Sequence, residues 1–224
     1  MLYSEPLTVA LGAAVLLALL RRRWLLAGIV GAVATAEASI LIVLAAVSGI
    51  AALQAIWSRR EWRALVAPAL TPLGILAFFG YLGPRYHDYA FWFQVERSGW
   101  GQHIDWGAQT LHILLWMDDG AFHRQKFLIT LYFVMLIVAA LGIVMMLAAR
   151  LPVPVSLYGV LTVLTFTLSP ANPRPRYVLC AFPLFIGAAA KLPRLLYWPV
   201  LAVSAFTLVF LIGWFPNHSI GPAP

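Results

Sequence analysis

Two arginines in the last quarter of the chain have the clearest potential for binding chemistry. Arg174 and Arg176 lie in the proline-rich stretch 169–177, directly before an apolar segment that begins at Tyr177. A guanidinium group can bind a phosphate through two parallel hydrogen bonds, so these residues could recognise a phosphate-bearing ligand. Alternatively, both side chains could extend along apolar surface toward water, as arginines at a membrane interface do. The sequence leaves both interpretations open.

A second set of polar residues has the spacing of a helix face. Asp105, Gln109 and His112 are separated by four and three positions, which places them on one side of a helix. Such a stripe could bind a polar headgroup or a sugar, although it is more often the solvated side of an amphipathic helix. The neighbouring face is apolar and comprises Ile104, Ala108, Leu111 and Leu115.

The other ionisable residues indicate no known type of site. Glu37 would be either a helix-end residue or the partner of an arginine, and the adjacent Asp118 and Asp119 point about 100° apart on a helix. Two His–Asp combinations could ligate a divalent ion, but neither has a recognised metal-site spacing, so we expect no metal or other cofactor. These combinations are His103 with Asp105 and His87 with Asp88.

The composition restricts the class of protein that carries these residues. Of 224 residues, 62% are hydrophobic and 10% are charged, whereas soluble domains have about 45–50% apolar and about 25% charged residues. We therefore predict an all-α, polytopic integral membrane protein in contact with the lipid bilayer. The net charge of +7 follows from basic residues in cytosolic loops, and we expect no nucleic-acid partner.

Apolar runs predict a single membrane domain, residues 1–224, with about eight spans. The run 24–57 is too long for one crossing and contains Glu37, so we divide it at residues 37–39. The long outer loop 83–125 is rich in aromatic residues and is expected to carry interfacial helices. The predicted spans are 6–20, 24–36, 40–57, 64–82, 126–149, 155–169, 177–190 and 194–215.

The distribution of charge supports this division. With the N-terminus outside, the inner loops hold nine basic residues and one acidic residue, and the outer segments hold six basic and seven acidic residues. An undivided run 24–57 would place the two densest basic clusters on opposite sides, against the positive-inside rule. The chain opens without a basic segment before its first span, so we expect it to be an internal piece of a longer protein.

Three short motifs resemble a known family. Tyr3–Leu7 and the connection Arg21–Gly28 resemble the Y-[ST]-E-[PS]-L helix and the R-x-R-W-x-x-A-G connection of GT-C glycosyltransferases. Residues Tyr89–Gln94, followed by Trp100, are similar to an outer-loop pattern of PIG-V-type mannosyltransferases, the second mannosyltransferase of glycosylphosphatidylinositol synthesis and its bacterial relatives. The stretch Pro175–Phe185 resembles the P-R-Y…F-P-x-F helix of the same family.

This resemblance implies a GT-C-like membrane enzyme that uses a polyprenyl-phosphate-linked sugar, usually mannose, on the non-cytosolic face. Arg176 and Arg174 would contact the donor phosphate. The other substrate-binding candidates are Tyr177, Gln94, Trp100, Asp105 and His112. We expect localisation in a bacterial plasma membrane, or in the endoplasmic reticulum membrane of a eukaryote.

Two departures from the family pattern limit the prediction. The family's catalytic aspartate lies upstream of the Y-S-E-P helix, where this chain begins, and Glu37 stands where the family has an arginine. The catalytic residue is therefore unknown, with Glu5 and Asp88 as candidates, and the chain could be inactive alone. The alternatives are a non-catalytic membrane subunit that packs with a partner chain supplying further helices, or, less favoured, a small transporter.

Overall fold

The computed structural model describes residues 4–100, 105–115, 126–168 and 175–217, in which every regular element is a helix. The all-α prediction is therefore confirmed for these residues. The α-helices are α1 (Glu5–Leu20), α2 (Trp24–Glu37), α3 (Val43–Arg59), α4 (Val66–Leu70), α5 (Leu73–Tyr86), α6 (Phe91–Trp100), α7 (Ala108–Leu115), α8 (Lys126–Ala148), α9 (Val153–Leu168), α10 (Pro183–Lys191) and α11 (Arg194–Asn217). Short 3₁₀ segments accompany them: η1 (Ser39–Ile42), η2 (Trp62–Leu65) and η4 (Pro175–Ala181).

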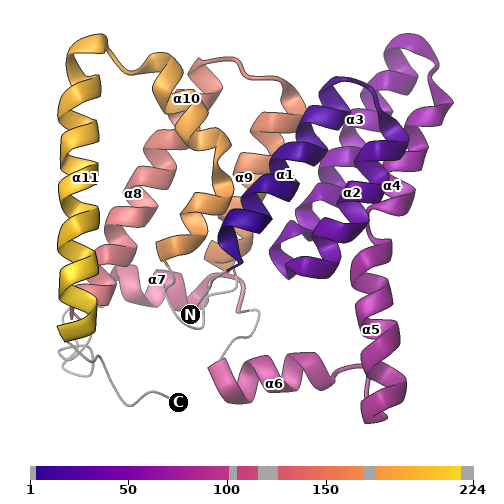
Figure 1. The fold of residues 1–224 in the computed structure, drawn as a ribbon, viewed down its shortest axis with the longest axis horizontal. Coiled ribbons are helices and arrows are strands. Elements are labelled where there is room, and N and C mark those ends of the chain that lie inside the picture. The colour runs from indigo at the N-terminus through magenta and orange to yellow at the C-terminus, as the bar shows by residue number, and fades with distance from the viewer. Residues whose placement is uncertain (1–3, 101–104, 116–125, 169–174, 218–224) are drawn as a thin grey trace.

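The long apolar run 24–57 is divided at residues 37–39. Helix α2 ends at Glu37, and Ala38 has extended backbone angles (φ −140°, ψ 124°) before η1 begins at Ser39. The helices α1 to α5 therefore run back and forth along the bundle, whereas α6 lies across its end (Figure 1). Helix α5 continues to Tyr86, four residues beyond the predicted end, and terminates where His87 adopts a left-handed φ of 55°.

Helix α2 packs closely against α4 and α5 because glycines line the contact. A Cβ atom added at Gly31 would lie 2.6 Å from Oγ1 of Thr71. A Cβ atom added at Gly74 of α5 would overlap the backbone carbonyl of Ala32. Small residues of this kind allow two helix backbones to approach each other closely.

A hydrogen bond between helices accompanies the break between α4 and α5. Pro72 has no N–H group, so the helix cannot continue with regular hydrogen bonding through this point. The hydroxyl of Thr35 in α2 donates to the carbonyl oxygen of Thr71 at 2.7 Å. The two threonines are 2% and 0% exposed, respectively. This buried bond fixes the start of α5 relative to α2.

Helix α9 connects the two apolar cores of the described chain. Its Tyr158 belongs to the core formed with α1–α4, and its C-terminal half belongs to the core formed with α8, η4 and α10. Glycines again mark the close contacts in the second core. A Cβ atom at Gly142 would lie 2.8 Å from Cβ of Leu184, and one at Gly187 would overlap the backbone of Met146.

The connections between helices at one end of the bundle are basic. Figure 1 shows the links α1–α2, α3–η2, α8–α9 and α10–α11 at the same end. Arg22, Arg60 and Arg150 adopt left-handed φ values of 55°, 56° and 53° in three of these links. Glu61 accepts a 2.7 Å hydrogen bond from Nε1 of Trp24 and lies 3.7 Å from the Arg22 guanidinium. The basic residues at this end are Arg21, Arg22, Arg23, Arg59, Arg60, Arg63, Arg150, Lys191 and Arg194.

Large apolar side chains cover much of the bundle's sides. On α2, Leu25, Ile29 and Val33 lie four residues apart and are more than half exposed. Helix α8 exposes a similar stripe that includes Ile137 and Leu141. In α11 every residue whose side chain is described is exposed.

By length and composition, two helical segments of the described chain could cross a membrane: Ser39–Arg59 and Trp62–Tyr86. Four further helices are apolar but have 10–17 described residues each: Glu5–Leu20, Trp24–Glu37, Tyr132–Ala148 and Val153–Leu168.

Candidate functional site

A cavity of about 630 Å³ lies at the end of the bundle opposite the basic connections. Helices α1, α2, α5, α6 and α9 contribute to its walls together with η1 and η4. The cavity therefore joins segments that are far apart in the sequence. Its lining residues are Ser4, Glu5, Thr8, Thr35, Ala36, Glu37, Ala38, Ser39, Ile40, Ile42, Ile75, Phe78, Phe79, Trp92, Phe93, Glu96, Thr165, Phe166, Tyr177 and Cys180.

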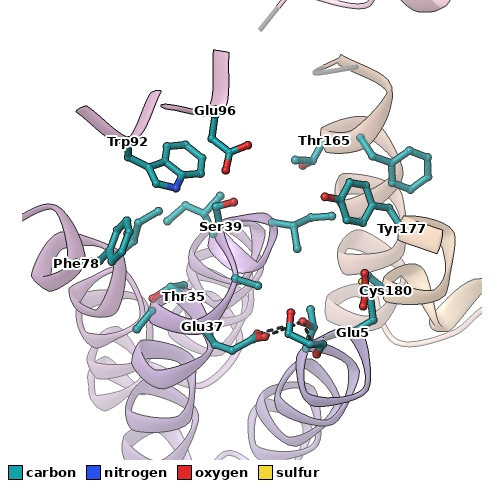
Figure 2. Close-up of a pocket in the computed structure, with 18 of the residues that line it drawn as sticks. Glu5, Thr35, Glu37, Ser39, Phe78, Trp92, Glu96, Thr165, Tyr177 and Cys180 are labelled. Carbon is teal, nitrogen blue, oxygen red and sulfur yellow. Dashed lines mark hydrogen bonds between the residues drawn. The ribbon is translucent and has the colours of Figure 1, made fainter. Parts of the chain in front are cut away.

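Carboxylates and hydroxyls form one side of the cavity. Glu5 begins α1 and Glu37 ends α2, so the α1–α2 pair brings both carboxylates to the same end (Figure 2). The hydroxyl of Thr8 lies 3.2 Å from Oε1 and 3.0 Å from Oε2 of Glu37, and 3.1 Å from the carbonyl oxygen of Ser4. Thr8 is 2% exposed, so a buried hydroxyl contacts the Glu37 carboxylate.

Aromatic rings and the Glu96 carboxylate form the opposite wall. Phe79 of α5 stacks on Phe93 of α6, with ring centroids 5.6 Å apart and planes 12° apart. Phe79 also meets Trp92 edge to face at 6.2 Å, and Trp92 meets Phe93 in the same way at 5.0 Å. The rings connect α6 to α5, and Figure 2 places Trp92 and Glu96 across the cavity from Glu37.

Two predicted site residues, Asp88 and Gln94, lie beside the cavity without lining it. One oxygen of Asp88 accepts the backbone N–H of Ala90 at 2.7 Å, and the other accepts Nε2 of Gln94 at 2.6 Å. Asp88 therefore forms a side-chain turn directly before α6, as aspartates commonly do with the N–H two residues ahead. Each of its carboxylate oxygens accepts one hydrogen bond, and both bonds hold the start of α6 in place.

The segment that carries the predicted arginines reaches the cavity through Tyr177. This tyrosine belongs to η4 and lines the cavity together with Cys180, which is 1% exposed. Arg176 belongs to the first turn of η4, but its side chain lies outside the described residues, as does all of Arg174. The prediction that these arginines bind a phosphate therefore stays a prediction.

The described part of the predicted stripe does not line the cavity. The residues of the stripe lie in α7 and in the turn before it: Asp105, Gln109 and His112. Asp105 accepts the backbone N–H of Gly107 at 2.9 Å, in the turn that precedes α7. Helix α7 is attached to its neighbours by Thr110, which bonds the Tyr132 hydroxyl at 2.9 Å and the carbonyl of Thr167 at 3.0 Å. Asp105 is thus a turn residue, whereas the side chains of Gln109, His112 and Trp100 lie outside the described residues.

Within the described ranges, no group of three histidine, cysteine or acidic residues is placed to hold a metal ion. Of the suggested pairs, His87 ends α5 and Asp88 forms the turn before α6. His103 lies outside the described residues.

Most of the lining residues were not predicted as site residues from the sequence, among them Thr8, Glu37 and Trp92. A usable signal was present, because Thr8, Thr35 and Glu37 are polar residues within otherwise apolar helices. Polar residues in such helices commonly face a bundle interior or a cavity. Two predicted residues, Glu5 and Tyr177, do line the cavity.

Comparison of the chain with protein-family models, with curated proteins and with solved structures finds no match. The resemblance to GT-C glycosyltransferases therefore depends on the three sequence motifs alone.

Proposed function

We propose that the chain is a multi-pass membrane protein whose cavity faces the non-cytosolic side. The exposed apolar side chains on α2, α8 and α11 support membrane burial, because soluble monomers rarely expose apolar patches larger than a few hundred Å². Helix α11, with 24 residues, is about 36 Å long and exceeds the hydrocarbon thickness of about 30 Å. The basic residues at one end favour that end as cytosolic under the positive-inside rule.

We further propose that the cavity binds the sugar of a polyprenyl-phosphate-linked donor and transfers it to an acceptor hydroxyl. The observation that carries this proposal is the cavity lining, which combines carboxylates and hydroxyls with aromatic rings. Sugars suit such a site, since their hydroxyls hydrogen-bond to carboxylates and their C–H faces pack against aromatic rings. The motif resemblance contributes the donor class, with mannose as the expected sugar.

In this proposal Arg176 contacts the donor phosphate. It immediately precedes Tyr177, which lines the cavity, and a guanidinium would stabilise the charge that develops on the departing phosphate. Tyr177 and the ring of Trp92 would contact the sugar. Gln94 would act indirectly, through its hydrogen bond to Asp88 in the turn before α6.

The exposed helix α11 favours a second candidate function, that of a membrane subunit packed against a partner chain. All of its described side chains are exposed, so lipid or a partner helix is expected to cover them. Mass measurement of the complex purified in mild detergent distinguishes these cases. A second polypeptide in stoichiometric amount favours the subunit, and the chain without one favours lipid.

Cysteine labelling tests the orientation. Cys180 is the sole cysteine, so a Cys180→Ala background allows single cysteines at two exposed serines. These are Ser98 on α6, at the cavity end, and Ser58 near the end of α3, at the basic end. In intact cells an impermeant maleimide should label the chain with Ser98→Cys, whereas Ser58→Cys should require permeabilisation. The opposite pattern would overturn the proposal.

Donor consumption tests the reaction. The purified chain in detergent is mixed with polyprenyl phosphate mannose labelled in the sugar, and loss of mannose from the lipid is followed, whatever hydroxyl accepts it. We expect turnover by the wild-type chain and a loss of about 100-fold or more for Arg176→Ala, a typical effect of removing a group that stabilises transition-state charge. A wild-type chain that neither binds nor consumes this donor contradicts the proposed reaction.

A further inference from the structure

We infer that Glu37 is the catalytic carboxylate of the cavity and that Thr8 is its positioning residue. This inference rests on the proposed sugar transfer and adds the residue that accepts the acceptor's proton.

The position of Glu37 is set by a helix. It is the last residue of α2, and the extended backbone of Ala38 turns the chain away into η1 directly after it. The side chain therefore projects from the end of a packed helix into the cavity (Figure 2). Groups held on regular elements are placed more accurately than groups on loops, as a reacting group requires.

The hydrogen bonding of Glu37 leaves it able to accept a proton. An ionised carboxylate has about four acceptor sites, and the single hydrogen of the Thr8 hydroxyl occupies at most one of them at a time. That hydrogen is shared, because the hydroxyl also lies 3.1 Å from the Ser4 carbonyl. Thr8 thus fixes the orientation of the carboxylate while its remaining acceptor sites stay available for an incoming hydroxyl.

Glu5 and Glu96 line the cavity together with Glu37, whereas three other carboxylates of the described chain have different tasks. Asp88 uses one oxygen on the backbone of Ala90 and the other on Gln94. Asp105 shapes the turn before α7. Glu61 is at the opposite end of the bundle, bonded to Trp24. Glu37 combines a place in the cavity with a contact from the buried hydroxyl of Thr8, and the inference rests on this pair.

The step that this geometry supports is general-base catalysis. The acceptor O–H proton passes to a carboxylate oxygen of Glu37 as the acceptor oxygen bonds to the anomeric carbon of the sugar. The bond from that carbon to the phosphate oxygen breaks at the same time, and polyprenyl phosphate departs with the electron pair. Protonated Glu37 then releases its proton to water. All the atoms come from the donor, the acceptor hydroxyl and the chain.

Two pairs of variants test the inference in the donor-consumption assay, with donor binding measured separately. Glu37→Gln keeps the size of the side chain and an acceptor oxygen but cannot take up a proton. We expect its kcat to fall by about 100-fold or more, while the donor Kd stays within about threefold. Glu61→Gln is the matched control at the opposite end of the bundle and should retain wild-type kcat.

Thr8 provides an independent readout. Thr8→Val should lower kcat and shift the acidic limb of the pH profile of kcat/KM, because the carboxylate loses the hydroxyl that orients it. Thr8→Ser restores the hydroxyl and should recover kcat to within about threefold of wild type. If the thermal melt shows that Glu37→Gln does not fold, the comparison of Thr8→Val with Thr8→Ser tests the inference.

The outcomes separate the two proposals. An active wild-type chain with an equally active Glu37→Gln variant overturns the role of Glu37 and leaves the proposed function standing. Equal activity and equal pH profiles of Thr8→Val and Thr8→Ser overturn the positioning role. A wild-type chain without binding or turnover of the donor overturns the proposed function and this inference together.

Discussion

Replacing Thr35 with valine removes one buried hydrogen bond at the junction of α2 and α5 and preserves the shape of the side chain. The lost donor is the hydroxyl that lies 2.7 Å from the carbonyl oxygen of Thr71. Both residues are essentially inaccessible to solvent, so water cannot take the place of the missing hydroxyl. The cost is therefore the desolvation of an unpaired buried carbonyl, about 1–3 kcal/mol.

This cost can be measured as a change in melting temperature. For a chain of about this length, 1 kcal/mol corresponds to about 2–4 °C, so Thr35→Val should melt about 2–12 °C below wild type. Tryptophan fluorescence of the detergent-solubilised protein during heating provides the assay. The matched control is Ser58→Ala, which removes an exposed hydroxyl bonded within its own helix to Gln54 and should melt within about 1 °C of wild type.

Thr35→Ser identifies the cause of any loss, because it keeps the hydroxyl and removes the methyl group. If the hydrogen bond is responsible, the serine variant melts above the valine variant. A valine variant that melts like wild type, with a serine variant that melts lower, would show that methyl packing stabilises this junction and would refute the reasoning.

Two further substitutions probe other contacts. Gly187→Ala places a methyl group against the backbone of Met146 and should destabilise the α8–α10 contact by about 1–3 kcal/mol. The control is Gly49→Ala, because Gly49 has open space around it. The Gly187→Ala variant should have the lower melting temperature of the two. Asp88→Ala removes the turn bond before α6 and the partner of Gln94 within α6, and should speed hydrogen exchange of the α6 amides while α9 amides stay unchanged. Unchanged α6 exchange would contradict a role of Asp88 in holding this helix.

The positions of the long helices could be predicted from the sequence because apolar runs and their interruptions are local signals. The division at residues 37–39 followed from an acidic residue within an apolar run, together with the placement of basic clusters. The end of α5 was predicted four residues too early, at residue 82, because the helix continues through Pro84 to Tyr86. Whether these helices cross a bilayer stays a prediction.

The candidate site was harder to predict, because its residues meet only through tertiary contacts. Asp88 and Asp105 were named as candidate site residues. In the structure each side chain accepts a hydrogen bond from the backbone N–H two residues ahead, which aspartates in turns commonly do. The pairing of Thr8 with Glu37 could have been predicted from the sequence. Thr8 precedes Arg22 by 14 positions and Glu37 follows it by 15, so an antiparallel helix pair that turns at Arg22 brings them level.

Under the proposed membrane orientation, the three arginines with left-handed φ in the basic connections would affect how the chain inserts. An L-residue at such φ values is strained by about 1–2 kcal/mol, and glycine would remove that strain. Glycine at Arg22, Arg60 and Arg150 should thus give a more heat-resistant folded chain but remove three charges from one end. In the proposed orientation, biosynthesis would then yield a mixture of upright and inverted molecules. Arginine at these positions would therefore cost backbone strain and, in return, favour a single orientation of the chain in the membrane.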